Sequence, residues 1–213
     1  MASNDARRRT ARALIDRCGQ TYAAQAGIRL RNTPGPLYRT VVLAHLLSAP
    51  IKADVAVAAA RALFEDGMRD PRRMAEATWQ QRVDALGKGH YRRYDERTAT
   101  QLGDGANLLL DRYGGDVRRM RGEDLERRLR ELPGIGPTGV NIFLREVQAV
   151  WPEYAPFIDG KARAGAERVG LPRSPEALGR LVDGEDVPRL TAGLVRVSLD
   201  RKLAEDVREH ASA

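Results

Sequence analysis

The segment from Leu132 to Thr138, which reads Leu-Pro-Gly-Ile-Gly-Pro-Thr, limits the possible folds of this chain more than any other feature. It is preceded by Leu125, Leu129 and Leu132, whose spacing is that of one helical face. A second apolar stretch follows it, and Pro137 suits the first position of a helix, where a missing N–H costs nothing. The segment therefore predicts a hairpin between two helices.

The residues of this hairpin suit the binding of an anion. Gly134 and Gly136 permit a tight turn and a close approach of the backbone to a ligand. The amides of Gly134, Gly136 and Thr138 then face the anion at the positive N-terminal end of the second helix. Taken alone, the motif also fits a plain connection between helices. The predicted phosphate contacts are Gly134, Ile135, Gly136 and Thr138.

Signals for strands are scarce, and alanine, leucine and arginine dominate the sequence. An all-α fold is therefore the economical prediction. Turn residues, such as those of Gly114-Gly115 and Ser174-Pro175, separate the helical stretches. The expected helices cover residues 6–25, 37–48, 53–66, 71–77, 79–86, 94–113, 123–132, 137–150, 160–169, 174–182 and 186–208.

An excess of basic residues favours a polyanion as partner. The chain has 36 Lys and Arg against 29 Asp and Glu, a formal net charge of +7. Three groups hold many of them: Arg7, Arg8, Arg9 and Arg12; Lys88, Arg92, Arg93 and Arg97; and Arg118, Arg119, Arg121, Arg127, Arg128 and Arg130. The third group leads into the hairpin, so we expect it to contact phosphate, whereas the first fits a solvated helix face equally well.

Composition also excludes several classes of protein. The sequence has no long apolar run, which argues against a membrane span. Its single cysteine, Cys18, excludes an internal disulfide and a four-cysteine metal site. The first twelve residues are polar and lack the apolar region of a secretory signal, so we expect a cytoplasmic, nucleoid-associated protein.

Beyond the hairpin, the segments Phe157-Ile158-Asp159-Gly160-Lys161 and Arg168-Val169-Gly170-Leu171 follow in order. With the hairpin, they resemble the helix-hairpin-helix DNA glycosylase superfamily, the group of endonuclease III and the adenine mismatch glycosylases. Two upstream segments, Leu43–Ala49 and Gly89–Ala99, are similar to further segments of that family. The resemblance extends over residues 30–171.

This resemblance implies an all-α fold with two lobes. A six-helix barrel lobe would cover residues 36–150 and end in the hairpin, and a lobe built from residues 1–35 and 151–213 would carry Asp159. In the family, DNA lies across both lobes and the damaged base enters the cleft between them. The implied function is excision of a damaged or mismatched base from duplex DNA, and we expect a monomer.

Asp159 is the candidate for the chemistry of such a reaction. Cleavage of an N-glycosidic bond develops positive charge on the sugar, which a nearby carboxylate stabilises. Asp159 also suits the N-cap of a helix, and the two roles are compatible. Bifunctional family members have a lysine where this chain has Thr138, so the resemblance implies the monofunctional branch. Lys161 is a substitute amine or, alternatively, a phosphate contact or surface residue.

Other candidates lie near the upstream segments. Where the family inserts a polar side chain into DNA, this chain has Pro50, and Pro50 or Ile51 could act there as an apolar wedge. His45 lies close to the place of the base-protonating carboxylate in adenine mismatch glycosylases, but it also fits a hydrogen-bonded core residue. Tyr91 and Arg92 are candidates for the DNA surface.

The resemblance also bears on cofactors. Endonuclease III carries an iron-sulfur cluster on four cysteines, and the single cysteine here predicts that this cluster is missing. No other cofactor is expected, although a monovalent cation at the hairpin stays possible. Two alternative functions remain open: a non-catalytic, damage-sensing DNA-binding protein, and a weak abasic-site lyase that uses Lys161 or the N-terminal amine.

Overall fold

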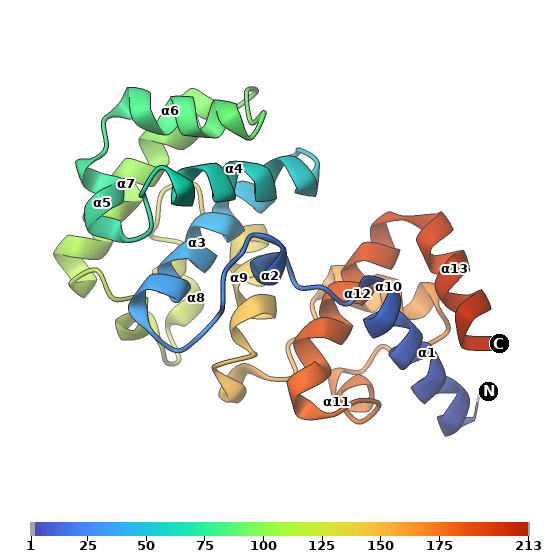
Figure 1. Ribbon diagram of the computed structural model, residues 1–213. Coiled ribbons are helices and arrows are strands. Elements are labelled where there is room, and N and C mark those ends of the chain that lie inside the picture. The colour runs from blue at the N-terminus through green and yellow to red at the C-terminus, as the bar shows by residue number, and fades with distance from the viewer. Residues whose placement is uncertain (1–2, 213) are drawn as a thin grey trace. The chain divides into compact units, whose positions relative to one another are not determined.

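A computed structural model describes residues 3–212, and over this range the chain forms helices and no strand (Figure 1). The predicted all-α fold is therefore confirmed. Contacts divide the chain into two compact units. We call residues 22–143 the central unit, and the two segments that end at Thr21 and begin at Leu144 the terminal unit.

The central unit is built around α3, α4 and α7. Helix α3 packs on α4, α4 packs on α6, and α7 packs against both α5 and α6. Leu43, Leu63 and Leu86 are among the side chains fully buried between these helices. The elements are α2 (Tyr22–Gln25), α3 (Pro34–Ser48), α4 (Ala53–Glu65), α5 (Pro71–Glu76), α6 (Trp79–Lys88), α7 (Asp95–Tyr113), η1 (Val117–Met120), α8 (Leu125–Leu129) and the first part of α9 (Pro137–Val147).

The terminal unit is organised around α12, which contacts α1, α10 and α13. Helices α10 and α12 pack closely because Gly165 has no side chain: a Cβ there would lie 2.7 Å from the carbonyl carbon of Leu194. The elements are α1 (Asn4–Cys18), the end of α9, η2 (Pro152–Tyr154), α10 (Gly160–Arg168), α11 (Pro175–Gly179), η3 (Gly184–Asp186), α12 (Val187–Leu199) and α13 (Arg201–Ser212).

The boundaries between the two units differ from the boundaries of the two lobes expected from the sequence. The first boundary falls after Thr21 instead of residue 35, since α2 contacts α3. The second falls after Phe143 instead of residue 150. Beyond it, the side chain of Gln148 makes hydrogen bonds to Phe157 and Thr191 of the terminal unit.

Two of the expected helices are interrupted. The helix expected over 6–25 ends at Cys18, where the amide of Gly19 still donates to the carbonyl of Ile15, and α2 begins only at Tyr22. The helix expected over 186–208 breaks at Asp200, whose backbone is extended and whose side chain accepts from the amide of Leu203. At Asp200, a polar residue that caps the new helix thus stops the old one.

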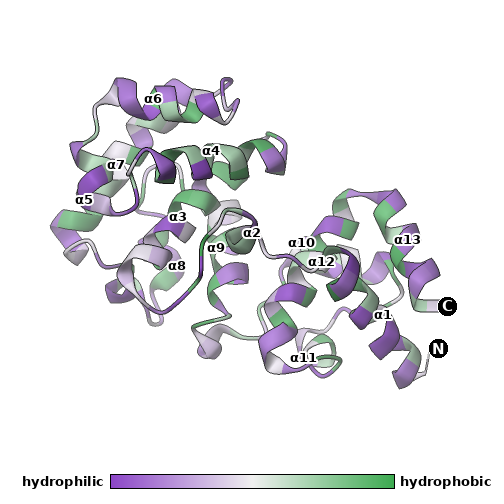
Figure 2. Cartoon of the chain, viewed as in Figure 1, coloured by the Kyte–Doolittle hydropathy of each residue, from purple (hydrophilic) through white to green (hydrophobic). Residues whose placement is uncertain are grey.

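The helices combine hydrophilic and hydrophobic positions along their length (Figure 2). This pattern is expected for helices that bury one face and expose the other. Within residues 3–212, no helix is both long and apolar enough to cross a membrane.

A buried arginine ties three helices of the central unit together. The guanidinium of Arg82, on α6, donates to the carbonyls of Met74 (2.9 Å), Ala77 (2.6 Å) and Ala99 (2.7 Å). These acceptors lie on α5, just after α5, and on α7. Gly103 on α7 makes room for the guanidinium, because a Cβ there would lie 2.7 Å from its Nη2.

Gly103→Ala should therefore lower the free energy of unfolding by roughly 1–3 kcal/mol, since Arg82 cannot move without losing its hydrogen bonds. Gly105→Ala, on the same helix, is the control: the nearest neighbour of its Cβ would be Cδ of Pro133 at 3.9 Å, and it should stabilise the protein by up to about 1 kcal/mol. Chemical denaturation measures both. Equal effects of the two substitutions would refute the packing role of Gly103.

Candidate functional site

The predicted hairpin is present in the central unit. Helix α8 ends at Leu129, the amide of Ile135 donates to the carbonyl of Leu132 at 3.0 Å, and α9 begins at Pro137. Gly134 has a φ of 84°, in the left-handed region that favours glycine. The prediction of a hairpin between two helices, with proline opening the second, is confirmed.

The two glycines of the hairpin have different roles, which the sequence did not distinguish. A Cβ on Gly134 would lie 2.6 Å from Cε1 of His45 and 2.7 Å from Oε1 of Gln101, so both conformation and space require glycine there. Gly136 has no positive φ, and a Cβ on it would meet nothing within 4 Å. The conformation of the turn therefore does not require glycine at position 136, and the small size of Gly136 leaves the backbone open to a ligand.

The start of α9 offers free backbone donors. Among the residues described, the amides of Gly134, Gly136 and Thr138 donate to no backbone acceptor, as is usual in the first turn of a helix. Gly134 and Thr138 are exposed, while the side chain of Ile135 is buried and anchors the loop. These amides lie at the positive end of the helix, where an anion is stabilised.

His45 and Gln101 lie directly against the hairpin at Gly134. The Nε2 of His45, on α3, lies 3.2 Å from Oε1 of Gln101, on α7, and His45 is only 7% exposed. Burial lowers the pKa of His45 to about 4, and the nearby charge of Arg97 acts in the same direction. The imidazole is therefore neutral near pH 7, in agreement with a hydrogen-bonded core histidine.

A pocket of about 290 Å³ opens beside the hairpin in the central unit. The candidate wedge Pro50 is exposed at this pocket, next to the C-terminal end of α3. The other lining residues are His45, Ser48, Ala49, Tyr91, Tyr94, Arg97, Thr98, Gln101 and Gly134. The structure thus brings Gly134 to the same place as two candidates far from it in sequence, His45 and Pro50.

Tyr91 does not offer a face for stacking on DNA. Its side chain is 2% exposed and its hydroxyl lies 3.3 Å from Oγ1 of Thr98, which donates to it. Burial raises the pKa of Tyr91. We correct the expectation accordingly: Tyr91 is a core residue, and the more accessible aromatic ring at the pocket is that of Tyr94.

Three arginines of the basic group next to the hairpin in sequence are paired with carboxylates of the protein itself. Arg118 pairs with Asp116 at 2.7 Å, and Arg127 pairs with both Asp124 (2.8 Å) and Glu131 (3.1 Å). Arg128 lies 3.7 Å from Asp124 and 3.4 Å from the carbonyl of Met120. The expectation that Arg128 is available for phosphate is therefore not supported, since its guanidinium already serves protein acceptors.

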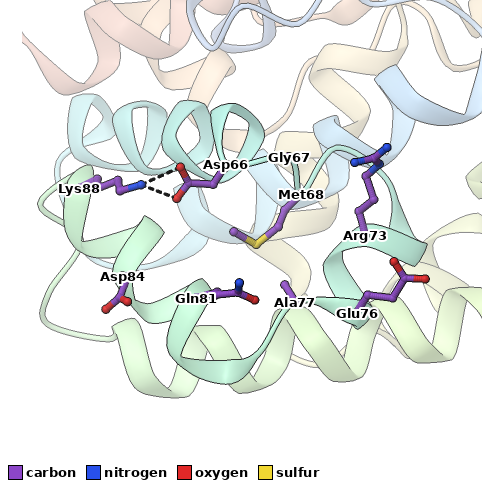
Figure 3. Close-up of a pocket in the computed structure, with 9 residues that line it drawn as sticks. All are labelled: Asp66, Gly67, Met68, Arg73, Glu76, Ala77, Gln81, Asp84 and Lys88. Atoms are coloured by element: carbon purple, nitrogen blue, oxygen red, sulfur yellow. Dashed lines mark hydrogen bonds and ion pairs between the residues drawn. The ribbon is translucent and has the colours of Figure 1, made fainter.

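In the second basic group, Lys88 is paired with a carboxylate, whereas the three arginines are not, over the residues that the structure describes. Lys88 donates to both carboxylate oxygens of Asp66 at 2.7 Å, in a separate pocket of about 570 Å³ formed by α5, α6 and the end of α4 (Figure 3). In contrast, Arg92, Arg93 and Arg97 are exposed, and the structure shows no ion pair for them within residues 3–212. The guanidinium of Arg93 lies over the ring of Tyr94, 5.3 Å from its centroid.

Asp159 belongs to the terminal unit and caps α10, as expected. Its Oδ1 accepts from the amide of Ala162 at 3.0 Å, and its Oδ2 lies 3.8 Å from Nε of Arg145. The side chains are 6% and 10% exposed, respectively. Lys161 is exposed in the first turn of α10.

Sequence reasoning missed Gln101 and Arg145. Neither belongs to a motif, and each is recognisable only by its partner in space, His45 and Asp159 respectively. Over residues 3–212 the structure contains no cluster of three or more His, Cys, Asp or Glu side chains that could hold a metal ion.

The burial of His45 predicts a pH dependence of stability. The unfolded histidine binds a proton near pH 6.5 but the folded one only near pH 4, so the unfolded chain binds more protons between these values. Stability that is complete above pH 6.5 should therefore fall, by at most about 3 kcal/mol, as the pH drops toward 4. His45→Gln should reduce this slope in denaturation curves measured between pH 4 and 7.

His90→Gln is the control for that experiment, because His90 is exposed on the same unit. If the pH dependence of stability persists in His45→Gln, or is lost in His90→Gln, its assignment to the burial of His45 is contradicted.

Comparison with known proteins places the fold. No family model matches the chain, and no curated protein matches it in sequence. Among solved structures, it is similar to a trapped covalent intermediate of endonuclease III with DNA, an estranged-adenine complex. The two chains are 20% identical and superpose with a TM-score of 0.50, over 79% of this chain and 75% of the other. A non-covalent endonuclease III–DNA complex matches with 21% identity, a TM-score of 0.50 and coverage of 80% and 75%. The resemblance found in the sequence motifs thus extends to three dimensions: the chain has an all-α fold similar to that of endonuclease III.

Proposed function

We propose that this protein binds duplex DNA and excises a damaged or mismatched base by hydrolysis of the N-glycosidic bond. The observation that carries the proposal is the hairpin, where three free amides lie at the start of α9. A DNA phosphate is the anion that this arrangement suits. The similarity in fold to endonuclease III, whose solved complexes contain DNA, supports the same partner.

The DNA surface of the central unit would combine the hairpin with the neighbouring pocket. Arg97 lines this pocket and, like the exposed Arg92 and Arg93 shortly before it in sequence, has no carboxylate partner among residues 3–212. Because amides and arginines contact phosphate rather than base edges, binding should not depend on sequence and should weaken with salt. Tyr94 and Pro50 add apolar surface at the same place, suited to an unstacked base step.

Asp159 would stabilise the positive charge that develops on the sugar as the bond to the base breaks. Its position is fixed at both oxygens, by the amide of Ala162 and by Arg145, which suits a group that must act without reorganisation. Thr138 cannot form an imine with the sugar. We therefore propose a monofunctional enzyme that acts as a monomer without an iron-sulfur cluster.

One observation favours a second candidate function, that of a DNA-binding protein without catalysis. Both oxygens of Asp159 already have partners and the side chain is 6% exposed, so the carboxylate has little access to a substrate in this conformation. In this reading Asp159 serves only as the helix cap, while the hairpin still binds DNA. Measurement of base release separates the two functions.

The charge pairing predicts which arginines contact DNA. Arg97→Gln should weaken binding to duplexes of any sequence and reduce the slope of log Kd against log salt by about 1. Arg127→Gln is the matched control, because Arg127 is already paired with Asp124 and Glu131 and should contribute little. Titration at several salt concentrations measures both, and equal losses would show that the pairing does not select the contacts.

Asp159→Asn tests the chemistry. The amide keeps the size of the side chain and an oxygen for the cap, but it removes the charge. On the best substrate from a panel of lesion-bearing duplexes, single-turnover base release should fall roughly 100-fold or more, while DNA affinity stays the same or increases.

Lys161→Gln is the control for this variant and should retain the rate of base release. Borohydride trapping on abasic DNA should give no adduct that depends on Lys161, whereas such an adduct would favour the lyase. A folded Asp159→Asn protein that releases base at the wild-type rate would leave the binding protein as the better function.

A further inference from the structure

The segment that leads into Asp159 is held by side chains instead of secondary structure. Residues 157–159 lie between η2 and α10 and belong to no helix. Their backbone groups therefore need other partners if they are not to remain unsatisfied. The side chains of Gln148 and Arg163 provide partners for the backbone of Phe157 and Ile158, and the backbone amide of Arg163 donates to the carbonyl of Asp159. Arg145 contacts the carboxylate of Asp159, and all three partner residues lie in the terminal unit.

Gln148 binds Phe157 through both of its backbone groups. The amide of Phe157 donates to Oε1 of Gln148 at 2.8 Å, and Nε2 of Gln148 donates to the carbonyl of Phe157 at 3.2 Å. The same Nε2 lies 3.0 Å from the carbonyl of Arg145 and 3.4 Å from Oγ1 of Thr191. Gln148 is 4% exposed, so a buried amide holds the chain much as a neighbouring strand would.

The next two residues are held in turn. Arg163 donates from Nε to the carbonyl of Ile158 at 3.1 Å. Arg145 lies 3.8 Å from Oδ2 of Asp159, while Oδ1 of that carboxylate is held by the amide of Ala162. Each residue from Phe157 to Asp159 thus has a specific polar partner.

Stability alone does not account well for this arrangement. A buried ion pair such as Arg145–Asp159 contributes little compared with apolar residues of similar volume, because both charges lose their hydration. What the network does achieve is a defined place for one carboxylate, and misplacement of a catalytic group by about 1 Å can lower a rate about 100-fold.

We propose that Gln148 and Arg145 are positioning residues for Asp159. Gln148 fixes the backbone that leads to Asp159, and Arg145 fixes the oxygen that the helix cap leaves free. This inference rests on the proposed function, in which Asp159 acts on the sugar, but its structural part can be tested without a substrate.

The variants are Gln148→Met, which keeps the length of the side chain but loses the bonds to Phe157, and Arg145→Met, which loses the charge. Arg145→Lys keeps the charge and should restore part of any loss. Thr191→Val is the matched control, because Thr191 contacts Gln148 but not the segment of Asp159.

Two measurements distinguish positioning from general stability. Hydrogen exchange of the Ala162 amide, followed by NMR, reports on the bond to Oδ1 of Asp159 and needs no activity. It should become at least about tenfold faster in Gln148→Met and Arg145→Met and stay unchanged in Thr191→Val. Unchanged exchange in both Met variants would overturn the proposal, whether or not the protein releases a base.

If the wild-type protein releases a base, single-turnover rates on the same variants give the second measurement. Both Met variants should lose about 10- to 100-fold with unchanged DNA affinity, and Arg145→Met should cause no further loss in an Asp159→Asn background. An equal loss in Thr191→Val, or additive losses with Asp159→Asn, would contradict positioning. Failure of the proposed function shows instead as no base release by the wild type on any duplex.

Discussion

The close approach of Gly134 to His45 and Gln101 is the constraint on which the candidate site depends. The loop can lie this near to α3 and α7 because Gly134 has no side chain and adopts a left-handed backbone. The neutral His45 and the amide of Gln101 interact with each other and pack against the turn at Gly134. With the turn held there, the first amides of α9 stay free and accessible, which is the property that makes the hairpin suited to phosphate.

The positions of the arginines indicate a DNA-binding surface only after their ion pairs with carboxylates are taken into account. Three of the arginines that precede the hairpin in sequence, Arg118, Arg127 and Arg128, lie within ion-pair distance of Asp116, Asp124 or Glu131, which reduces their field at short range. Arg92, Arg93 and Arg97 have no such partners in the described part of the chain, and Arg97 lies at the pocket next to the hairpin. The basic surface that the proposed function needs is therefore formed by the start of α7 and the residues before it.

Asp159 shows how one residue can serve structure and chemistry together. The helix cap gives the carboxylate a fixed direction, and the side chains of Arg145 and Gln148 restrict it further. These contacts also leave the carboxylate little access to a substrate. Measurement of base release therefore separates a catalytic Asp159 from one that only caps the helix. Both functions use the same fold and hairpin.

The sequence by itself determined the helical class, the hairpin with Pro137 at the start of α9, and the cap at Asp159, because these depend on local preferences of a few neighbouring residues. It did not locate the helix breaks after Cys18 and before Arg201, where capping competes with helix continuation. Tertiary structure alone decided that Tyr91 is buried, that Arg128 is occupied and that His45 meets Gln101. Burial and pairing depend on residues far apart in the chain, and no local pattern in a single sequence records which of them meet.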